Sequence, residues 1–145
     1  MQCKLLKVPG LDQRDESVTK IFALEIAGKS PALAALVQWA ERQQADFKSI
    51  MKVLKLIGTS TRVLNESHVT RGENFPSSYE ARADKRHARL YFFYDASETG
   101  SKAILTNQYW KTGGGKGEKN AQAKAFADCD KLRCLYFANK NNLVS

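Results

Sequence analysis

The sequence predicts a protein of the α+β class, in which an N-terminal strand and a helical hairpin pack on an antiparallel β-meander that a C-terminal helix follows. Three observations lead to this prediction. Residues 88–94 are rich in aromatic side chains and contain no Gly or Pro, which is typical of a strand in the middle of a sheet. Two stretches between residues 31 and 57 repeat apolar residues at helical spacing. A further helical pattern runs from Glu118 to about residue 139, and its expected stripe consists of Ala121, Ala125, Cys129, Leu132 and Tyr136.

The chain is long enough to form a hydrophobic core as one domain over residues 1–145. No apolar run approaches the roughly 18 residues of a membrane-spanning helix, and the first residues lack the apolar segment of a secretory signal. We therefore expect a cytoplasmic location. Cys129 and Cys134 would point about 140° apart on a helix, which fits neither a zinc knuckle nor a local disulfide.

The formal net charge of +8 favours a polyanionic partner. A nucleic acid, an acidic protein and an anionic membrane surface all meet that description. The charge is partly concentrated, since four basic residues and one acidic residue lie between Arg82 and Arg89.

The N-terminal part of the chain begins with residues 1–17, an extension in which residues 3–8 form either a short strand of the sheet or a segment for docking on a partner. Residues 12–17 are polar and indicate a loop. Thr19–Ile26 alternates like a strand. Ser30 and Pro31 then predict the start of a helix, with Ser30 as N-cap and Pro31 at the first helical position.

Two helices are expected next, and the few polar residues between them predict an antiparallel hairpin. The second helix should run from about residue 46 to residue 57, with Gly58 ending it. The residues expected to face the core are Leu33, Leu36, Val37 and Ala40 in the first helix and Phe47, Ile50, Met51, Leu54 and Ile57 in the second.

The meander follows a polar stretch, residues 59–78, that predicts an irregular connection. Its strands are Tyr79–Arg82, residues 88–94 and residues 102–110, with a polar turn at residues 95–100. Both faces of the central strand carry apolar bulk, so both should be covered. Alternation puts Arg89, Tyr91 and Phe93 on one face and Leu90, Phe92 and Tyr94 on the other, and in the last strand it puts Ile104 and Thr106 opposite Ala103, Leu105 and Asn107.

The glycine-rich stretch 112–117 precedes a helix, as nucleotide-binding loops do. It does not fit a Walker A loop, because Trp110 and Gly117 stand where that motif requires Gly and Ser or Thr. Two interpretations remain. The stretch is either a basic loop that brings Lys111, Lys116 and Lys119 to an RNA backbone, or a solvated linker.

Arg89 and His87 are the residues around the central strand that could carry chemistry. Arg89 begins this strand and is either a phosphate-binding group on a rigid scaffold or an edge cation with a solvated head. His87 is either a general base, whose pKa the neighbouring cations would lower, or a surface histidine. Neither His68 nor His87 has partners at metal-ligand spacing, so we expect no metal and no cofactor.

Several segments resemble the phage-derived HigB-type toxins of the RelE/ParE superfamily. Residues 20–31 are similar to the first strand and helix start of that family, and Tyr79–Arg82 with residues 89–94 to its paired central strands. Residues 104–112, with the basic helix that follows, are similar to its last strand and C-terminal segment. The resemblance covers roughly residues 18–138.

This resemblance implies the toxin of a type II toxin–antitoxin system, acting as a ribosome-dependent, metal-independent mRNA endonuclease. A ribose 2′-OH would attack the adjacent phosphate. The partners would be mRNA, the ribosome and a cognate antitoxin in a hetero-oligomer, with no membrane. Arg82 and Arg89 match the strand positions that hold basic catalytic residues in the family, and substituting Arg89 by Ala should then abolish growth arrest with thermal stability nearly intact.

Further residues complete this expected site. Lys85 and Arg86 would bind RNA together with the three lysines of the last segment, and His87 would be the base. Tyr91 and Trp110 would either stack on bases or belong to ordinary sheet packing. The alternatives to an endonuclease are a ParE-like toxin that inhibits gyrase and a relative that binds nucleic acid without cleaving it.

Overall fold

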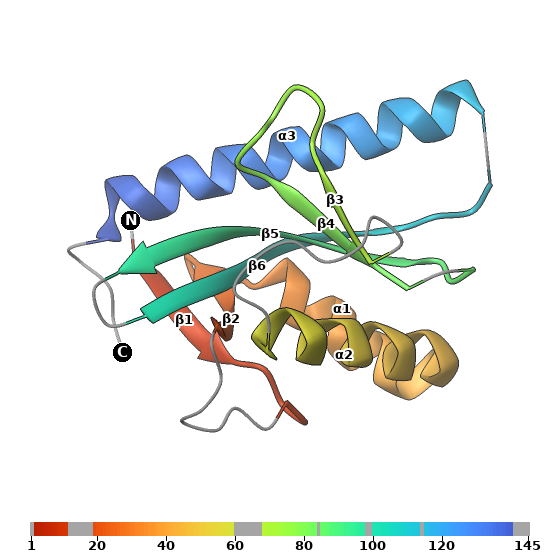
Figure 1. The fold of residues 1–145 in the computed structure, drawn as a ribbon, viewed down its shortest axis with the longest axis horizontal. Helices are drawn as coiled ribbons and strands as arrows, with labels where there is room; N and C mark the ends of the chain where they lie inside the picture. Colours follow the sequence, from red (N-terminus) through yellow and green to blue (C-terminus); the bar gives the residue numbers. More distant parts are fainter. Residues whose placement is uncertain are drawn as a thin grey trace.

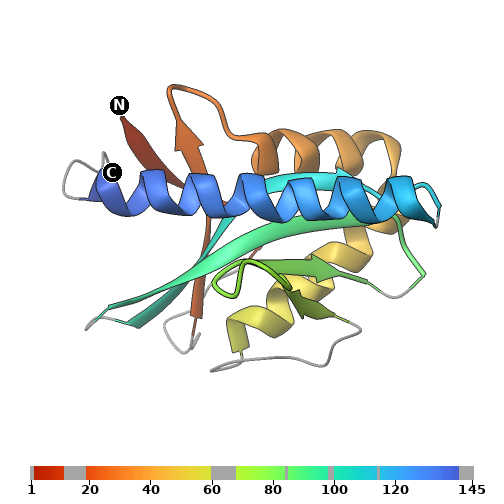
Figure 2. The ribbon, with the colours of Figure 1, turned by 90° about the horizontal axis from the view of Figure 1, so that it is seen from above.

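The computed structural model describes residues 2–11, 19–59, 68–83, 85–97, 100–113 and 115–140. It has a mixed sheet with a pair of helices on one face and a single long helix on the other (Figures 1 and 2). The predicted α+β class is therefore confirmed. The strands are β1 (Cys3–Lys7), β2 (Thr19–Ile26), β3 (Val69–Arg71), β4 (Tyr79–Arg82), β5 (Ala88–Ser97) and β6 (Gly100–Trp110), and the helices are α1 (Pro31–Arg42), α2 (Gln44–Thr59) and α3 (Lys116–Ala138).

The strand order is β1-β2-β6-β5-β4-β3, and β4, β5 and β6 form the predicted antiparallel meander. β2 pairs parallel with β6, and β1 pairs antiparallel with β2, so the N-terminal residues extend the sheet. The prediction for residues 59–78 is wrong in part, because the three-residue strand β3 pairs with β4. The loop expected at residues 12–17, and residues 60–67 of the connection, lie outside the described residues.

Helix α1 begins as predicted, because the Ser30 side chain accepts a hydrogen bond from the Leu33 backbone N–H at 3.4 Å. Its buried face differs from the expected stripe. Val37, expected in the core, is 52% exposed, whereas Trp39 is buried. This helix carries apolar residues on most of its own sides, so their spacing alone does not predict which side the sheet covers. The buried residues are Ala32, Ala35, Leu36 and Trp39.

One residue separates the end of α1 from the start of α2, and the chain turns back between them (Figures 1 and 2). Its predicted stripe is confirmed except for Phe47, which is only partly buried. Gly58 lies inside the helix and does not end it; a Cβ there would lie 3.4 Å from the Thr19 carbonyl oxygen. The absence of a side chain lets α2 pack closely on β2.

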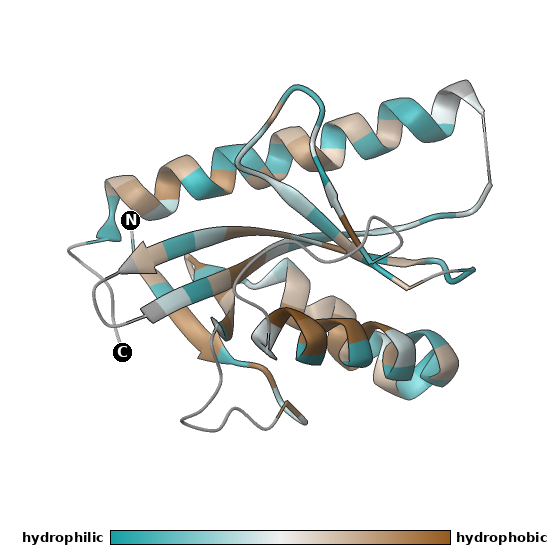
Figure 3. Cartoon of the chain, viewed as in Figure 1, coloured by the Kyte–Doolittle hydropathy of each residue, from teal (hydrophilic) through white to brown (hydrophobic). Residues whose placement is uncertain are grey.

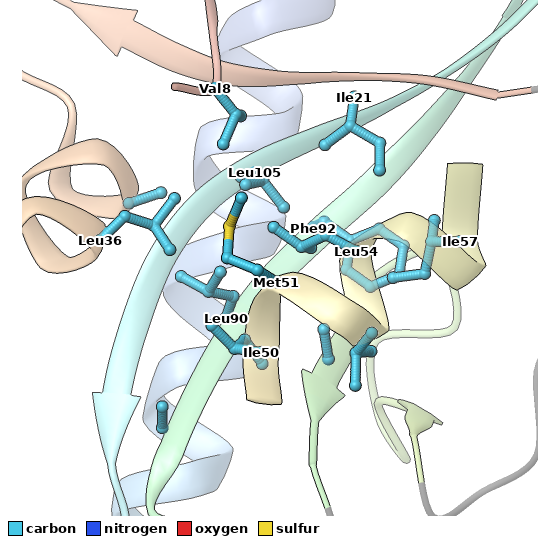
Figure 4. Close-up of a cluster of buried hydrophobic side chains, with 14 of the residues drawn as sticks. Val8, Ile21, Leu36, Ile50, Met51, Leu54, Ile57, Leu90, Phe92 and Leu105 are labelled. Carbon is cyan, nitrogen blue, oxygen red and sulfur yellow. The ribbon is translucent and has the colours of Figure 1, made fainter. Parts of the chain in front are cut away.

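The larger core lies between the hairpin and the sheet, where α2 side chains such as Met51 and Leu54 meet Leu90, Phe92 and Leu105 (Figure 4). Figure 3 shows the same arrangement as hydropathy: α2 carries strongly hydrophobic residues between hydrophilic ones, whereas α3 alternates between hydrophilic and weakly hydrophobic residues along its length. The helix pair is thus the main source of apolar burial.

The two faces of β5 are covered as predicted. Leu90 and Phe92 belong to the core with the hairpin. On the opposite face Tyr91 packs with Ala125 and Cys129 of α3, and Phe93 packs with Tyr136. The Tyr136 hydroxyl donates to the Asp95 carboxylate at 2.6 Å, which fixes the C-terminal part of α3 on β5.

A β-bulge changes the alternation of β6. Leu90 pairs with Gln108 and Phe92 pairs with Leu105, so β6 has one residue more than β5 between these pairs. Asn107 consequently turns toward α3, where its amide donates to the Ala125 carbonyl oxygen at 3.0 Å. The prediction that Asn107 shares a face with Leu105 is therefore wrong. The turn expected at residues 95–100 is also shorter, because β5 continues to Ser97.

Helix α3 begins two residues earlier than predicted and buries Ala125, Cys129 and Tyr136 of the expected stripe. Among the residues that the structure describes, no helix has the length and apolar character needed to cross a membrane.

Candidate functional site

Arg89 lies beneath α3 and is only 5% exposed. Its Nη1 donates to the carbonyl oxygens of Arg86 at 2.6 Å and Ala88 at 3.1 Å, so the guanidinium holds the turn that precedes β5. The alternative of an edge cation with a solvated head is therefore wrong. The guanidinium that we expected to bind phosphate is engaged inside the protein.

Glu80 of β4 is the buried acid that faces Arg89. It is 2% exposed, and its Oε1 lies 3.7 Å from Arg89 Nε. Its Oε2 accepts from the Tyr91 hydroxyl at 2.6 Å and from Gln122 Nε2 of α3 at 3.4 Å. Burial lowers the pKa of Arg89, and the Glu80 carboxylate opposes this effect. These contacts join β4, β5 and α3 through one buried polar group.

Tyr91 is fully buried against α3. Burial raises the pKa of its hydroxyl, and the Glu80 carboxylate raises it further. Its ring cannot stack on a base without leaving the core. Of the two interpretations given for Tyr91, the structure therefore supports sheet packing.

Arg82 extends the site across the sheet. It pairs with Arg89 on the neighbouring strand, and Arg89 pairs with Tyr109 of β6. On the other side, the Arg82 backbone N–H donates to the His68 carbonyl oxygen at 2.8 Å. Directly paired residues point to the same face of a sheet, which for Arg89 and Tyr109 is the face under α3. We call His68, Arg82, Arg89 and Tyr109 the arginine row.

Tyr109 is a partly exposed member of this row. Loss of solvation raises the pKa of its hydroxyl, and the Glu118 carboxylate of α3 raises it further. Tyr109 carries its proton at neutral pH as any tyrosine does, and the raised pKa makes its hydroxyl a weaker acid than that of a free tyrosine. Its partly exposed hydroxyl can still donate this proton to a leaving group. Sequence reasoning missed Tyr109 and His68 as site residues. The strand register identifies Tyr109 by aligning it with Arg89, and local sequence patterns do not provide that register.

His87 lies in a different environment. Its Nδ1 donates to the Lys111 carbonyl oxygen at 2.6 Å, so a proton transfer at this ring would involve Nε2. The ring stacks on Trp110, with the ring centroids 5.0 Å apart. The Trp110 ring in turn packs against Trp39 of α1, with centroids 6.1 Å apart. His87 thus joins the hairpin side of the sheet, whereas Arg89 lies on the α3 side. The structure does not group His87 with the two arginines.

Asp46, in the first turn of α2, anchors the residues around His87. It is 6% exposed, and its Oδ2 accepts from the backbone N–H groups of His87 at 2.7 Å and Ala88 at 2.9 Å. This carboxylate joins the hairpin to the start of β5. Together, Asp46 and Arg89 bind the turn from opposite sides of the sheet.

The other predicted RNA-binding residues lie mainly at the same end of the sheet, on the right in Figure 1. Lys85 and Arg86 are exposed in the turn before β5, and Trp110 and Lys111 are partly exposed after β6. Lys119 is exposed on α3. The side chain of Lys116 lies outside the described part of the structure. The arrangement is a basic end of the sheet that surrounds the arginine row.

Comparisons of the chain with family models, with curated proteins and with solved structures found no match. Among the described residues, no group of three or more His, Cys, Asp or Glu side chains could hold a metal ion.

Proposed function

We propose that the chain is a toxin of the RelE/HigB kind that cleaves mRNA on the ribosome and is neutralised by an antitoxin in a hetero-oligomer. The observation that carries this proposal is the arginine row at the basic end of the sheet. It combines a partly exposed arginine, a proton-holding tyrosine and a histidine, which are groups that phosphodiester cleavage needs. The order of strand, helical hairpin, meander and helix supports the same proposal.

The reaction is an attack of the ribose 2′-oxygen on the adjacent phosphorus. A P–O2′ bond forms and the P–O5′ bond breaks, which gives a 2′,3′-cyclic phosphate and a 5′-hydroxyl. Arg82 binds the phosphate and stabilises the negative charge that develops on it. Tyr109 gives its proton to the departing 5′-oxygen. Arg89 adds positive charge behind Arg82 and holds the turn, without contact to the phosphate.

Two histidines can take the proton from the 2′-OH. His68 is a partly exposed residue of the arginine row, and its carbonyl oxygen accepts from the Arg82 backbone N–H. His87 presents Nε2 from the hairpin side, and its role as base requires the RNA to bend around the end of the sheet. Substituting each histidine by Ala separates these roles, because the base contributes roughly 10²–10⁴-fold to the rate.

The test uses the purified chain with ribosomes that carry a defined mRNA, and primer extension locates new 5′-ends. We expect cuts that require ribosomes and leave 5′-hydroxyl ends. Arg82→Ala should slow cleavage by roughly 10²–10³-fold. Arg42→Ala, which removes an exposed arginine from the end of α1, should leave the rate unchanged. Intact mRNA with the wild-type chain would refute the proposal.

One observation favours a toxin that inhibits gyrase instead. Arg89 and Tyr91, two of the residues expected at the RNA, are buried. A basic surface that docks on a protein would need neither of them. Growth arrest with intact mRNA and an induced DNA-damage response would support this second function.

A further inference from the structure

A cavity of about 340 Å³ lies on the α3 side of the sheet, between the β3–β4 segment and α3. The turn between β3 and β4 lies beside the N-terminal half of α3 (Figures 1 and 2), and these two segments form the walls of the cavity. The volume falls at the lower end of the range of about 300–1,000 Å³ found for small-ligand pockets. The residues that matter are Arg71, Asn74 and Phe75 on the sheet side and Lys119, Gln122 and Phe126 on α3.

The lining has the groups that recognise an unpaired nucleotide. Phe75 and Phe126 are partly exposed phenyl rings on which a base can stack. Asn74 offers a side-chain amide for the base edge. Lys119 is an exposed cation that suits a phosphate. Arg71 is engaged elsewhere, because its guanidinium lies over the Tyr79 ring and donates to the Tyr79 hydroxyl at 3.3 Å. Glu73 is the acidic residue of the lining, so the charged side chains sum to +1.

The walls are held in place by the buried polar group described above. Phe126 packs edge-on against Tyr91, with ring centroids 5.1 Å apart and an angle of 81° between the planes. Gln122 donates to Glu80, which also binds Tyr91. These contacts fix the α3 wall before a ligand arrives, and such preorganisation lowers the cost of binding.

Gly72 sets how closely the two walls approach. A Cβ at this position would lie 2.8 Å from Phe126 Cδ1 and 2.9 Å from the Phe75 carbonyl oxygen. Any larger residue would push apart the two segments that carry the phenyl rings. The cavity therefore depends on the missing side chain of Gly72, and not on a backbone conformation that only glycine adopts.

The cavity adjoins the arginine row. Thr70, in its wall, pairs with Glu80, and Arg82 follows Glu80 by two residues on the same strand. Two residues of a strand span about 7 Å. An RNA whose phosphate lies on Arg82 can thus place a neighbouring nucleotide at the cavity.

We propose that this cavity binds one unpaired nucleotide of RNA, with the base against Phe75 and Phe126 and a phosphate at Lys119. The identification of the ligand as RNA rests on the proposed function. The cavity then reads a base next to the cleavage point and gives the enzyme a sequence preference of its own.

The test is fluorescence anisotropy with a fluorescein-labelled pentaribonucleotide, carrying 2′-O-methyl riboses so that it cannot be cleaved, and without ribosomes. We expect Phe75→Ala to weaken binding about fivefold or more, as loss of one stacked base does. Phe137→Ala removes a partly exposed phenyl ring at the other end of α3 and should leave affinity unchanged. Lys119→Ala and Lys131→Ala both remove one exposed lysine of α3, and only the first should weaken binding strongly.

A second series places one abasic nucleotide at each position of the probe in turn. We expect one position to lose about fivefold or more in affinity, and this loss to vanish in Phe75→Ala. Equal losses at all positions, unchanged binding by Phe75→Ala, or no binding of the probe would overturn the inference. Cleavage on ribosomes by a chain that lacks base-dependent binding would overturn the cavity proposal alone. Base-dependent binding without any cleavage would overturn the endonuclease proposal alone.

Discussion

Substituting Arg89 by Ala should lower the stability of the folded protein, because this side chain makes several contacts in the interior. The change removes the hydrogen bonds from Nη1 to the carbonyl oxygens of Arg86 and Ala88. It also leaves the Glu80 carboxylate buried without the cation 3.7 Å from its Oε1. The sequence alone led us to expect nearly unchanged stability, because it did not indicate that this arginine is buried.

The magnitude follows from the cost of breaking a buried ion pair. Removing one partner and leaving the other charged costs about 3–5 kcal/mol. For a chain of this length, each kcal/mol lowers the Tm by about 3–4 °C. We therefore expect Arg89→Ala to lower the Tm by about 10–20 °C.

The assay is thermal and urea unfolding followed by circular dichroism. Arg86→Ala is the matched control, since this arginine is three residues away and exposed, and its stability should stay within about 0.5 kcal/mol of wild type. Adding Glu80→Gln to Arg89→Ala should restore part of the loss, because the uncompensated charge is then gone. If Arg89→Ala had the same Tm as the Arg86→Ala control, the buried ion pair would contribute little to stability and the reasoning would be wrong.

Three other substitutions test separate parts of the structure. Because burial raises the pKa of Tyr91, its contribution to stability is complete below about pH 10 and is lost at higher pH, by up to about 1.4 kcal/mol per pH unit. Tyr91→Phe should remove that loss in urea titrations between roughly pH 8 and pH 11, and equal slopes for both proteins would contradict it. Asp46→Ala should cost about 2–4 kcal/mol, since two backbone N–H groups lose their acceptor, and should speed amide exchange at His87 and Ala88. Ser30→Ala should cost about 1 kcal/mol in urea unfolding through loss of the helix cap, and an unchanged midpoint would exclude that role.

Local patterns predicted most elements of the fold. Ser30 and Pro31 marked the start of α1, and the alternation in β5 assigned its side chains to the correct faces. What local patterns could not provide was pairing between distant segments. The three-residue strand β3 exists because β4 pairs with it, and the parallel pairing of β2 with β6 joins segments about 80 residues apart in the chain.

The candidate site shows the same division. The family resemblance led us to expect Arg82 and Arg89 as catalytic cations, and this expectation stays a prediction. Nothing in the sequence indicated that Glu80 would lie beside Arg89 in the interior. That pairing depends on the register between β4 and β5. The register also placed Tyr109 beside Arg89, whereas the one-residue bulge in β6 turned Asn107 away from its expected face.

The central claim is that this chain stops growth by cutting mRNA at the arginine row. The most direct measurement is controlled expression in a bacterial host, with growth and mRNA 5′-ends followed together over minutes, for wild type and for Arg82→Ala. We expect rapid arrest with new 5′-ends inside coding regions for wild type, and neither for Arg82→Ala at equal protein level. Arrest without new 5′-ends, or cleavage that Arg82→Ala leaves unchanged, would contradict the claim.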